Sequence, residues 1–406
     1  MSTPARHLHR GTPEYRKASV VLFMAGFMAF SLLYVVQGTL PAVSTAFGVS
    51  PATASLTLSL TTLPLAVAVI VAASWSEGYG RRPLLIGALI GAALLTLAAA
   101  ASPRFEVLLG LRVLTGLVLA GLPAVAMAYV AEEFHPSGLG AAMGLYISGT
   151  GLGGMTGRLG GALISSTLSW RAALMLVGAM CLVGGVWVAV RLPDSRNFVR
   201  TAGSLRSRMA AMRAPLRDPV ILRMAGCGFV LMGSLVSYFN YLQYRLVGPS
   251  FHLSPSLTAL VFGLYVFGTV SANWMGRLAD RRSRRSVVLL GMAIMALGAG
   301  ASLSGNLVVV LLGSAAMVFG FFGAHAVTSG WVNAWATQQR AQASSLYLFG
   351  YHLGSSLAGY VGGLLFGAFG WPGEVGTVII LLLAGATLAV GLPTHARSEL
   401  RAHAAR

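Results

Sequence analysis

Arg112, His325 and His352 can carry charge or protons, and each lies inside a long apolar run of this 406-residue sequence. An arginine inside an apolar helix costs at least about 2.5 kcal/mol to insert into a membrane, so Arg112 is expected to face protein or water and to have a role. An imidazole titrates near neutral pH and can pass on a proton. The alternative is that all three only make hydrogen bonds within the helix packing.

Aromatic and amide side chains also interrupt the apolar runs, where a lipid-facing surface would not need them. Aromatic faces with a few amides suit flat, apolar or cationic solutes through stacking and cation–π contacts. Some of these tyrosines could instead lie at a membrane interface. The candidates for a small-molecule cavity are Tyr34, Gln37, Tyr146, Tyr238, Asn240, Tyr241, Tyr265, Phe322, Tyr347 and Tyr351.

The elements that must position these residues follow from composition. The chain is 56% hydrophobic and 9% charged, against roughly a quarter charged in soluble domains. Runs near the length of about 20 residues that spans a bilayer recur along it. The sequence predicts an all-α membrane protein of twelve transmembrane helices, with runs at 18–43, 53–74, 84–101, 106–131, 140–164, 172–192, 219–244, 256–275, 287–303, 307–332, 343–368 and 375–392.

The net charge of +18 would suggest a nucleic acid partner in a soluble protein. Here the basic residues lie in short clusters in alternate segments between the runs, as expected for loops on the cytoplasmic side. We therefore expect both termini inside and no nucleic acid partner. The only basic residues expected on the opposite side of the membrane are Arg104, Arg158, Arg171 and Arg245.

A basic polar stretch divides the chain into two halves. We expect a cytoplasmic tail at 1–17, a six-helix bundle at 18–192, a cytoplasmic basic linker at 193–218, a second bundle at 219–393 and a tail at 394–406. An internal repeat supports this division, because 144–154 aligns with 345–355 at an offset of 201 and 77–82 aligns with 280–285 at 203. Two related halves of this kind place a binding site at their interface near mid-membrane.

The loops at 73–82 and 276–285 resemble the loop signature of the major facilitator superfamily, Gly-x-x-x-Asp-Arg-x-Gly-Arg-Arg. Ala73, Glu77 and Ser283 depart from it. The resemblance implies a latch in which a carboxylate sits against the positive end of a helix, with Glu77 facing Ser344 and Ser345, and Asp280 facing Ser137. The alternative is that the charges only anchor the topology. The gating candidates are Glu77, Gly80, Arg81, Arg82, Asp280, Arg281, Arg284 and Arg285.

Two further motifs carry the same resemblance. Residues 108–116 resemble the family's signature around an arginine in the fourth span, which implies a coupling or substrate role for Arg112. Residues 149–158 are close to the antiporter signature Gly-x-x-x-Gly-Pro-x-x-Gly-Gly, although Gly154 and Arg158 replace the proline and the last glycine. One face of that helix carries glycines every four residues, which permits close backbone approach. This motif could serve as a pivot between the halves or only allow tight helix packing, and the two interpretations are equally supported. Its residues are Gly149, Gly153, Gly154, Gly157 and Arg158.

The whole chain resembles the acriflavine-sensitivity (YnfM-like) branch of the drug:proton antiporters. This implies a multi-pass protein of the bacterial inner membrane that exports an amphipathic or cationic drug-like solute by alternating access, as a monomer and in exchange for protons. We expect His325 and His352 to exchange the coupling proton, since Glu106, Glu132, Glu133 and Glu374 fall at span ends.

The alternatives are a sugar or metabolite facilitator without proton coupling and, remotely, a membrane sensor or enzyme. No nucleophile–base constellation or metal-ligand spacing favours an enzyme. Cys181 and Cys227 lie in apolar runs and are expected to be packing residues. No cofactor and no metal are expected.

Overall fold

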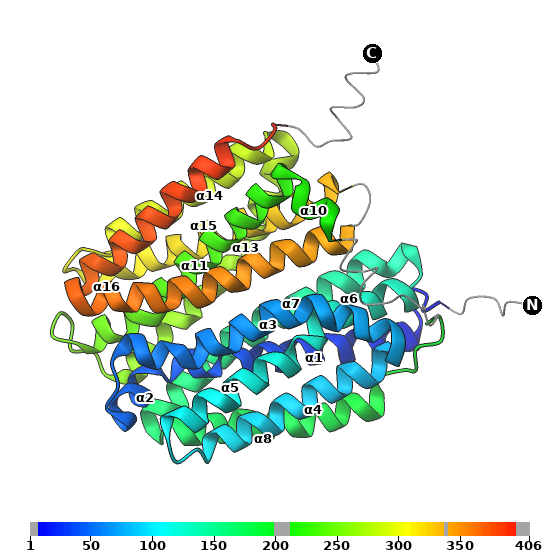
Figure 1. Ribbon diagram of the computed structural model, residues 1–406, viewed down its shortest axis with the longest axis horizontal. Helices are drawn as coiled ribbons and strands as arrows, with labels where there is room; N and C mark the ends of the chain where they lie inside the picture. Colours follow the sequence, from blue (N-terminus) through cyan, green and yellow to red (C-terminus); the bar gives the residue numbers. More distant parts are fainter. Residues whose placement is uncertain (1–6, 199–211, 337–339, 395–406) are drawn as a thin grey trace, which may run out of the picture. The chain divides into compact units, whose positions relative to one another are not determined.

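The computed structural model describes residues 7–198, 212–336 and 340–394, which are helical apart from turns and one isolated β-bridge between Leu8 and Phe134 (Figure 1). Within these ranges, ten helices are long and apolar enough to cross a membrane. The first helices are α1 (Pro13–Gly38), α2 (Leu40–Phe47), α3 (Pro51–Tyr79), α4 (Arg81–Ala100), α5 (Phe105–Leu119), α6 (Gly121–Glu133), α7 (Pro136–Thr167) and α8 (Trp170–Arg191).

The later helices follow the basic stretch, of which 199–211 lies outside the described residues. They are α10 (Arg213–Arg217), α11 (Pro219–Val247), α12 (Pro255–Ala259), the 3₁₀ helix η1 (Leu260–Tyr265), α13 (Val266–Arg281), α14 (Arg284–Ala301), α15 (Leu307–Trp335) and α16 (Arg340–Val390).

Capping side chains set the starts of several helices. Asp218 accepts a hydrogen bond of 2.9 Å from the Val220 amide, and Pro219 occupies the first helical position of α11. Asn306 likewise accepts one of 2.9 Å from the Val308 amide at the start of α15. Both residue types favour this position because their oxygens satisfy amides that have no partner in the first turn.

The long helix α16 is interrupted at Gly370. This residue has φ 63° and ψ −154°, a conformation open to glycine and unfavourable for other residues. Pro372 follows it and cannot continue the preceding hydrogen-bond ladder. The break falls between the predicted runs 343–368 and 375–392, and it separates two helical segments.

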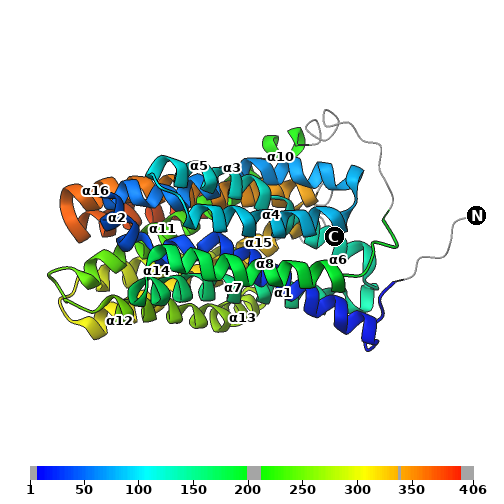
Figure 2. The same cartoon turned by 90° about the horizontal axis from the view of Figure 1, so that it is seen from below.

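The contacts divide the described residues into two units. The first comprises Met1–Val43 and Val67–Leu205, and the second comprises Ser44–Ala66 and Arg206–Arg406. In the first unit α1 packs on α7 and α8, and α4 packs on α5 and α8. In the second, α11 packs on α16, and α15 packs on α13 and α14 (Figures 1 and 2). The beginning of α3 therefore belongs to the second unit.

Both units contain the same glycine contact, which is the structural counterpart of the sequence repeat. In the first unit, a methyl group at Gly157 of α7 would lie 2.7 Å from the Ser31 carbonyl oxygen of α1. Gly149 and Gly153 meet α1 backbone in the same way. The second unit repeats this arrangement at the offset of 201, with two glycines of α16 against the α11 backbone, namely Gly350 against Ala225 and Gly354 against Phe229.

Two arginines that the sequence assigned to outer segments lie inside helices instead. Arg158 is 3% exposed within α7, and Arg245 is 9% exposed within α11. Buried polar groups can satisfy an arginine head inside a helix bundle, which the charge pattern alone does not show. Arg245 donates to the Ser304 carbonyl at 2.8 Å and its guanidinium lies 5.1 Å from the Trp371 ring centroid.

Candidate functional site

Arg112 is fully buried in α5 and binds the backbone of α1. Its Nη2 donates to the Leu33 carbonyl at 3.0 Å and more weakly to the Leu32 carbonyl at 3.4 Å. These carbonyls supply the polar partners that a buried guanidinium requires. The contacts fit the structural alternative raised from the sequence, and a coupling role for Arg112 stays a prediction.

Arg158 brings together residues that the sequence left in separate groups. Its Nε donates to Gln37 Oε1 at 2.6 Å, its Nη1 donates to the Gly154 carbonyl at 2.8 Å, and its guanidinium lies 3.5 Å from the Tyr34 ring centroid. Tyr34 and Gln37 are three residues apart on α1 and share a helix face. The result is a buried cation with an aromatic face and an amide around it, which we call the Arg158 group.

The two candidate histidines lie in one aromatic cluster of the second unit. Nδ1 of His325, on α15, is 2.8 Å from the Tyr347 hydroxyl on α16. The Tyr351 ring centroid is 4.9 Å from that of His325 and 5.0 Å from that of His352. His325 also stacks on Phe321 at 5.6 Å. We call these five residues the His–Tyr cluster.

His352 is 5% exposed, and its Nδ1 has no hydrogen-bond partner within the described ranges. Both histidines contact the ring of Tyr351. Their proton exchange stays a prediction.

Further aromatic candidates of the second unit extend this cluster. Phe322 lies 5.0 Å from Phe321 and 5.9 Å from Tyr265, measured between ring centroids. Tyr238 is 2.9 Å from the Ser314 hydroxyl and packs 5.1 Å from the Trp371 ring. Tyr146 belongs to the first unit, where it is buried against Gly26 of α1.

Asn240 and Tyr241 of α11 face the small residues of α16. The Tyr241 hydroxyl donates to the Gly359 carbonyl, and the Ser55 hydroxyl of α3 donates to the same oxygen at 3.2 Å. Asn240 is fully buried beside Gly359, where an added methyl group would lie 3.2 Å from its Nδ2. Both side chains are therefore buried against neighbouring helices.

One acidic residue that the sequence placed at the end of a span is fully buried. Glu374 follows the break at Gly370 and is 0% exposed. The break turns the second segment of α16 back into the helix packing, and Trp371 fixes it by donating to the Ser302 carbonyl at 3.0 Å. Glu374 therefore lies at the start of a helical segment, as the sequence predicted, and its side chain lies inside the protein, which the sequence did not show.

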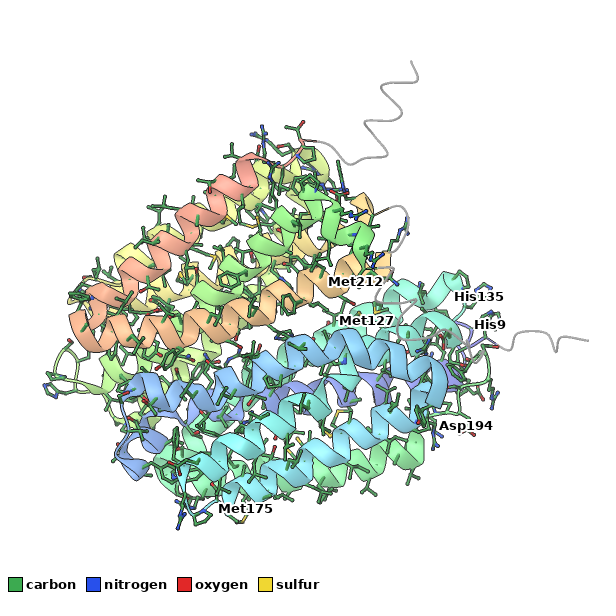
Figure 3. The ribbon with its side chains drawn as sticks, in the orientation of Figure 1. His9, Met127, His135, Met175, Asp194 and Met212 are labelled. Carbon is green, nitrogen blue, oxygen red and sulfur yellow. The ribbon has the colours of Figure 1, made fainter. Side chains whose placement is uncertain are left out.

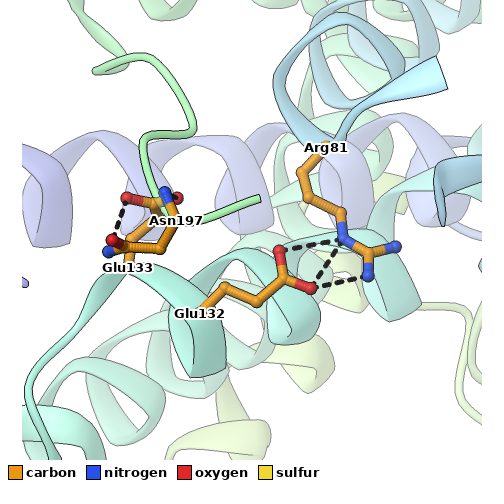
Figure 4. Close-up of polar contacts among 4 residues, drawn as sticks. All are labelled: Arg81, Glu132, Glu133 and Asn197. Atoms are coloured by element: carbon orange, nitrogen blue, oxygen red, sulfur yellow. Dashed lines mark hydrogen bonds and ion pairs between the residues drawn. The ribbon is translucent and has the colours of Figure 1, made fainter. Parts of the chain in front are cut away.

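The first gating loop is anchored within the first unit. Gly80 has φ +97°, which favours glycine, and it precedes α4. Arg81 pairs with Glu132 of α6 at 2.6 Å (Figure 4). Arg82 donates to the carbonyls of Ala189 and Leu192 at 2.6 and 2.9 Å. The Glu77 side chain lies outside the described residues.

The second gating loop repeats one of these contacts. Arg285 donates to the carbonyls of Val390 and Leu392 at 3.3 and 3.4 Å, as Arg82 does at the end of α8. Arg284 has a buried Nη1 for which the described chain supplies no partner. Asp280 and Arg281 are exposed.

The residues before α1 are fastened to the same end of the first unit as the first gating loop. The Leu8 amide donates to the Glu133 carbonyl at 2.8 Å, and the rings of His9 and His135 stack at 4.6 Å (Figure 3). Glu133 in turn accepts a hydrogen bond of 2.9 Å from the Asn197 amide (Figure 4). Ser137, the expected partner of Asp280, is 2.9 Å from Nδ1 of His135.

Replacing Glu132 by glutamine is expected to lower the free energy of unfolding by about 1–3 kcal/mol. The change leaves Arg81, which is 9% exposed, without its carboxylate, and removing one partner of a buried pair is costly. The matched control is Asp194→Asn, since the Asp194 carboxylate is 84% exposed at 3.5 Å from Arg82 and should contribute below about 1 kcal/mol. Thermal unfolding of the purified protein in detergent measures both. Equal midpoints for the two variants would contradict a structural role for the Arg81–Glu132 pair.

Comparison with known proteins gives matches over nearly the whole chain. The sequence model described as Major Facilitator Superfamily matches residues 22–247 and 225–405. The "Uncharacterized MFS-type transporter YybF" of Bacillus subtilis is 41% identical over 93% of both chains. The "Inner membrane transport protein YnfM" of Escherichia coli is 38% identical over 98% of this chain and 95% of its own.

Two more distant proteins also match. The first is a solved structure with a similar fold, and the second is a relative whose name states an activity. The crystal structure of a bacterial homologue of the human lysosomal transporter Spinster, inward-facing and unoccupied, has a TM-score of 0.76 at 17% identity, covering 93% of this chain and 97% of that one. A chloramphenicol resistance protein of Streptomyces lividans is 27% identical over 64% of this chain and 66% of its own.

Proposed function

The chain belongs to the Major Facilitator Superfamily and is a multi-pass membrane transporter, and we propose that it exports a small organic solute in exchange for protons. In this proposal the protein is a monomer of the bacterial inner membrane with twelve spans and both termini in the cytoplasm. The solute is aromatic and amphipathic or cationic, and the two halves alternate its access. The efflux direction and the drug:proton antiporter branch are supported by the chloramphenicol resistance relative and by the glycine motif of α7.

The observation that carries the proposal is the His–Tyr cluster. It places titratable imidazoles directly against aromatic faces, with His325 stacked on Phe321 and 4.9 Å from Tyr351. A flat cation held on those faces and a proton on His325 would repel each other at this separation. Solute and proton would therefore occupy the cluster alternately, which is the condition that antiport requires.

A second candidate, transport of an organic carboxylate, is favoured by the Arg158 group. A guanidinium recognises a carboxylate in a planar, two-point geometry, and the Tyr34 ring offers a surface for an attached aromatic group. Arg158 is only 3% exposed, so a conformational change would have to expose its guanidinium to the solute.

The test uses the purified full-length protein in liposomes that carry a pH-sensitive dye and an imposed pH gradient. Ethidium, chloramphenicol, 4-hydroxybenzoate and xylose serve as cationic, neutral, anionic and sugar probes. We expect ethidium or chloramphenicol to evoke a proton flux. Tyr351→Ala should reduce this flux about 5- to 30-fold through loss of stacking worth about 1–2 kcal/mol. The exposed Tyr79→Ala is the matched control.

The alternatives give different outcomes in the same experiment. A flux with 4-hydroxybenzoate alone would favour the second candidate. Solute exchange without any proton movement would instead identify a facilitator and overturn the antiport proposal.

A further inference from the structure

The Glu374 carboxyl is buried in the second unit without a compensating charge. The residue is 0% exposed, and within the described ranges neither carboxylate oxygen has a hydrogen bond of acceptable geometry and no ion pair includes it. The Ser237 hydroxyl of α11 lies beside it. An ionised carboxylate in such a setting is very costly, so the group there requires a bound proton or an arriving cation.

Gly362 of α16 leaves the space that this carboxyl occupies. A methyl group at position 362 would lie 2.5 Å from Glu374 Oε2 and would overlap the Ser237 hydroxyl. The neighbouring Gly363 leaves room in the same way for the Tyr241 hydroxyl. The two glycines, together with Ser237, form a pocket shaped for a carboxyl group and a hydroxyl group.

A row of buried polar groups continues from this pocket toward the His–Tyr cluster. Ser356 is 2.7 Å from the Thr62 hydroxyl and donates to the Ser59 carbonyl at 3.0 Å. Ser55 and Tyr241 meet at the Gly359 carbonyl. We call this row the polar seam, and its members on α3, α11 and α16 are Ser55, Ser59, Thr62, Ser234, Ser237, Asn240, Tyr241, Ser355, Ser356, Gly359 and Gly362.

The seam reaches His352 at its other end. His352 lies one helical turn before Ser355 and Ser356 on α16, and ten residues before Gly362, which corresponds to about 15 Å along the helix. The buried hydroxyls of Ser234, Ser237 and Ser355 have no hydrogen-bond partner of their own in the described part of the chain. Hydroxyl groups that can both donate and accept are suited to pass a proton along such a row.

The charged and titratable groups around Glu374 do not supply a fixed counter-ion. On α11 these are the phenols of Tyr238 and Tyr241, and Arg245. Nη2 of Arg245 donates to the Ser304 carbonyl and its guanidinium lies 5.1 Å from the Trp371 ring centroid, while its buried Nη1 has no hydrogen-bond partner within the described ranges and forms no ion pair with Glu374. The start of α3 and the segment 298–312 contain no charged residue. On α16 itself the nearest titratable side chains in sequence are Tyr360 and His352.

We infer that the Glu374 carboxyl is a proton-binding site and, resting on the proposed antiport, that it takes up and releases the coupling proton at the end of the seam opposite His352. The step is a single reversible protonation. The carboxylate gains a proton and becomes the acid, whose O–H donates to Ser237, and it loses the same proton when access changes.

The first arm of the test needs no transported solute. Dicyclohexylcarbodiimide modifies protonated carboxyls in apolar surroundings, so the full-length protein in liposomes is treated across about pH 5 to about pH 10 and its peptides are analysed by mass spectrometry. We expect modification of Glu374 that decreases as the pH rises. Gly362→Ala should lower this modification by disturbing the pocket. No modification of Glu374 at any pH, or the same extent at every pH, would overturn the inference.

The second arm measures ethidium accumulation driven by a pH gradient. Glu374→Gln keeps the shape and the seam but removes the proton site, so the gradient-driven accumulation ratio should fall to about one while ethidium exchange continues. The exposed Glu106→Gln is the matched control. Full gradient-driven accumulation in Glu374→Gln would overturn the coupling role. If the unaltered protein moved no protons with any probe, the proposed function would fail, and the modification arm would still decide whether Glu374 binds a proton.

Discussion

Alanine at Gly153 is expected to destabilise the first unit strongly, whereas alanine at Gly151, two residues away on α7, is expected to stabilise it slightly. Alanine is favoured over glycine in a helix by about 1 kcal/mol, and this term applies at both positions. At Gly151 nothing lies within 4 Å of the added methyl group. At Gly153 the methyl would overlap the Phe27 carbonyl of α1, and overpacking of this kind costs about 1–3 kcal/mol or more.

At Gly153 the steric cost should exceed the gain in helix propensity. The methyl group would meet backbone atoms, which cannot rotate away as a side chain can. The same contact also carries a hydrogen bond of 3.0 Å from the Ser31 hydroxyl to the Gly153 carbonyl. Thermal unfolding in detergent should show a lower midpoint for Gly153→Ala and an equal or higher one for Gly151→Ala. The second unit offers a repeat of the comparison with Gly354→Ala against Gly367→Ala. Equal midpoints within a pair would contradict the close seating of the two helices.

The glycine face shows which parts of the fold a single sequence can predict. Close approach of two helices is encoded by small residues at every fourth position, and this spacing at Gly149, Gly153 and Gly157 is visible without any structure. The partner helix is not visible in the same way. The repeat offset gave only an indirect signal that α16 uses Gly350 and Gly354 for the same contact.

The sequence did not predict the burial of Arg158, because that burial depends on neighbours far away in the chain. Arg158 is buried because Tyr34 and Gln37, more than a hundred positions earlier, receive its guanidinium. Charge counting cannot register such partners. The spacing of Tyr34 and Gln37 on one helix face was an available signal, but nothing in the sequence linked it to α7.

The burial of Glu374 was missed for a different physical reason. An acidic residue next to a turn signal is normally a loop residue, and Gly370 and Pro372 are such signals. Here the break reverses the chain so tightly that Glu374 already lies in the packed segment after it. The nearby Trp371 was an available signal, because a large apolar side chain directly after a turn favours an immediate return to the interior.

Replacing both His325 and His352 by glutamine is expected to abolish solute accumulation driven by a pH gradient and to leave solute exchange intact. Glutamine keeps the size and polarity of the side chain, and it can still bond to the Tyr347 hydroxyl that meets His325 at 2.8 Å. It cannot take up a proton. One pH unit corresponds to about 1.4 kcal/mol for each proton moved, which sustains at most about a tenfold concentration ratio.

The unaltered protein should therefore reach a ratio approaching about tenfold per proton and pH unit in the liposome assay, and the double variant should stay near about one. His252→Asn is the matched control, since His252 is exposed and its φ of 50° is tolerated by asparagine. Of the single variants, His325→Gln should have the larger effect, because His325 is held between Phe321 and Tyr351 where solute is proposed to bind. An unchanged ratio in the double variant would contradict exchange at the His–Tyr cluster. It would transfer the coupling proton to Glu374 alone, or to Glu132 or Glu133, whose carboxylates already bind Arg81 and Asn197.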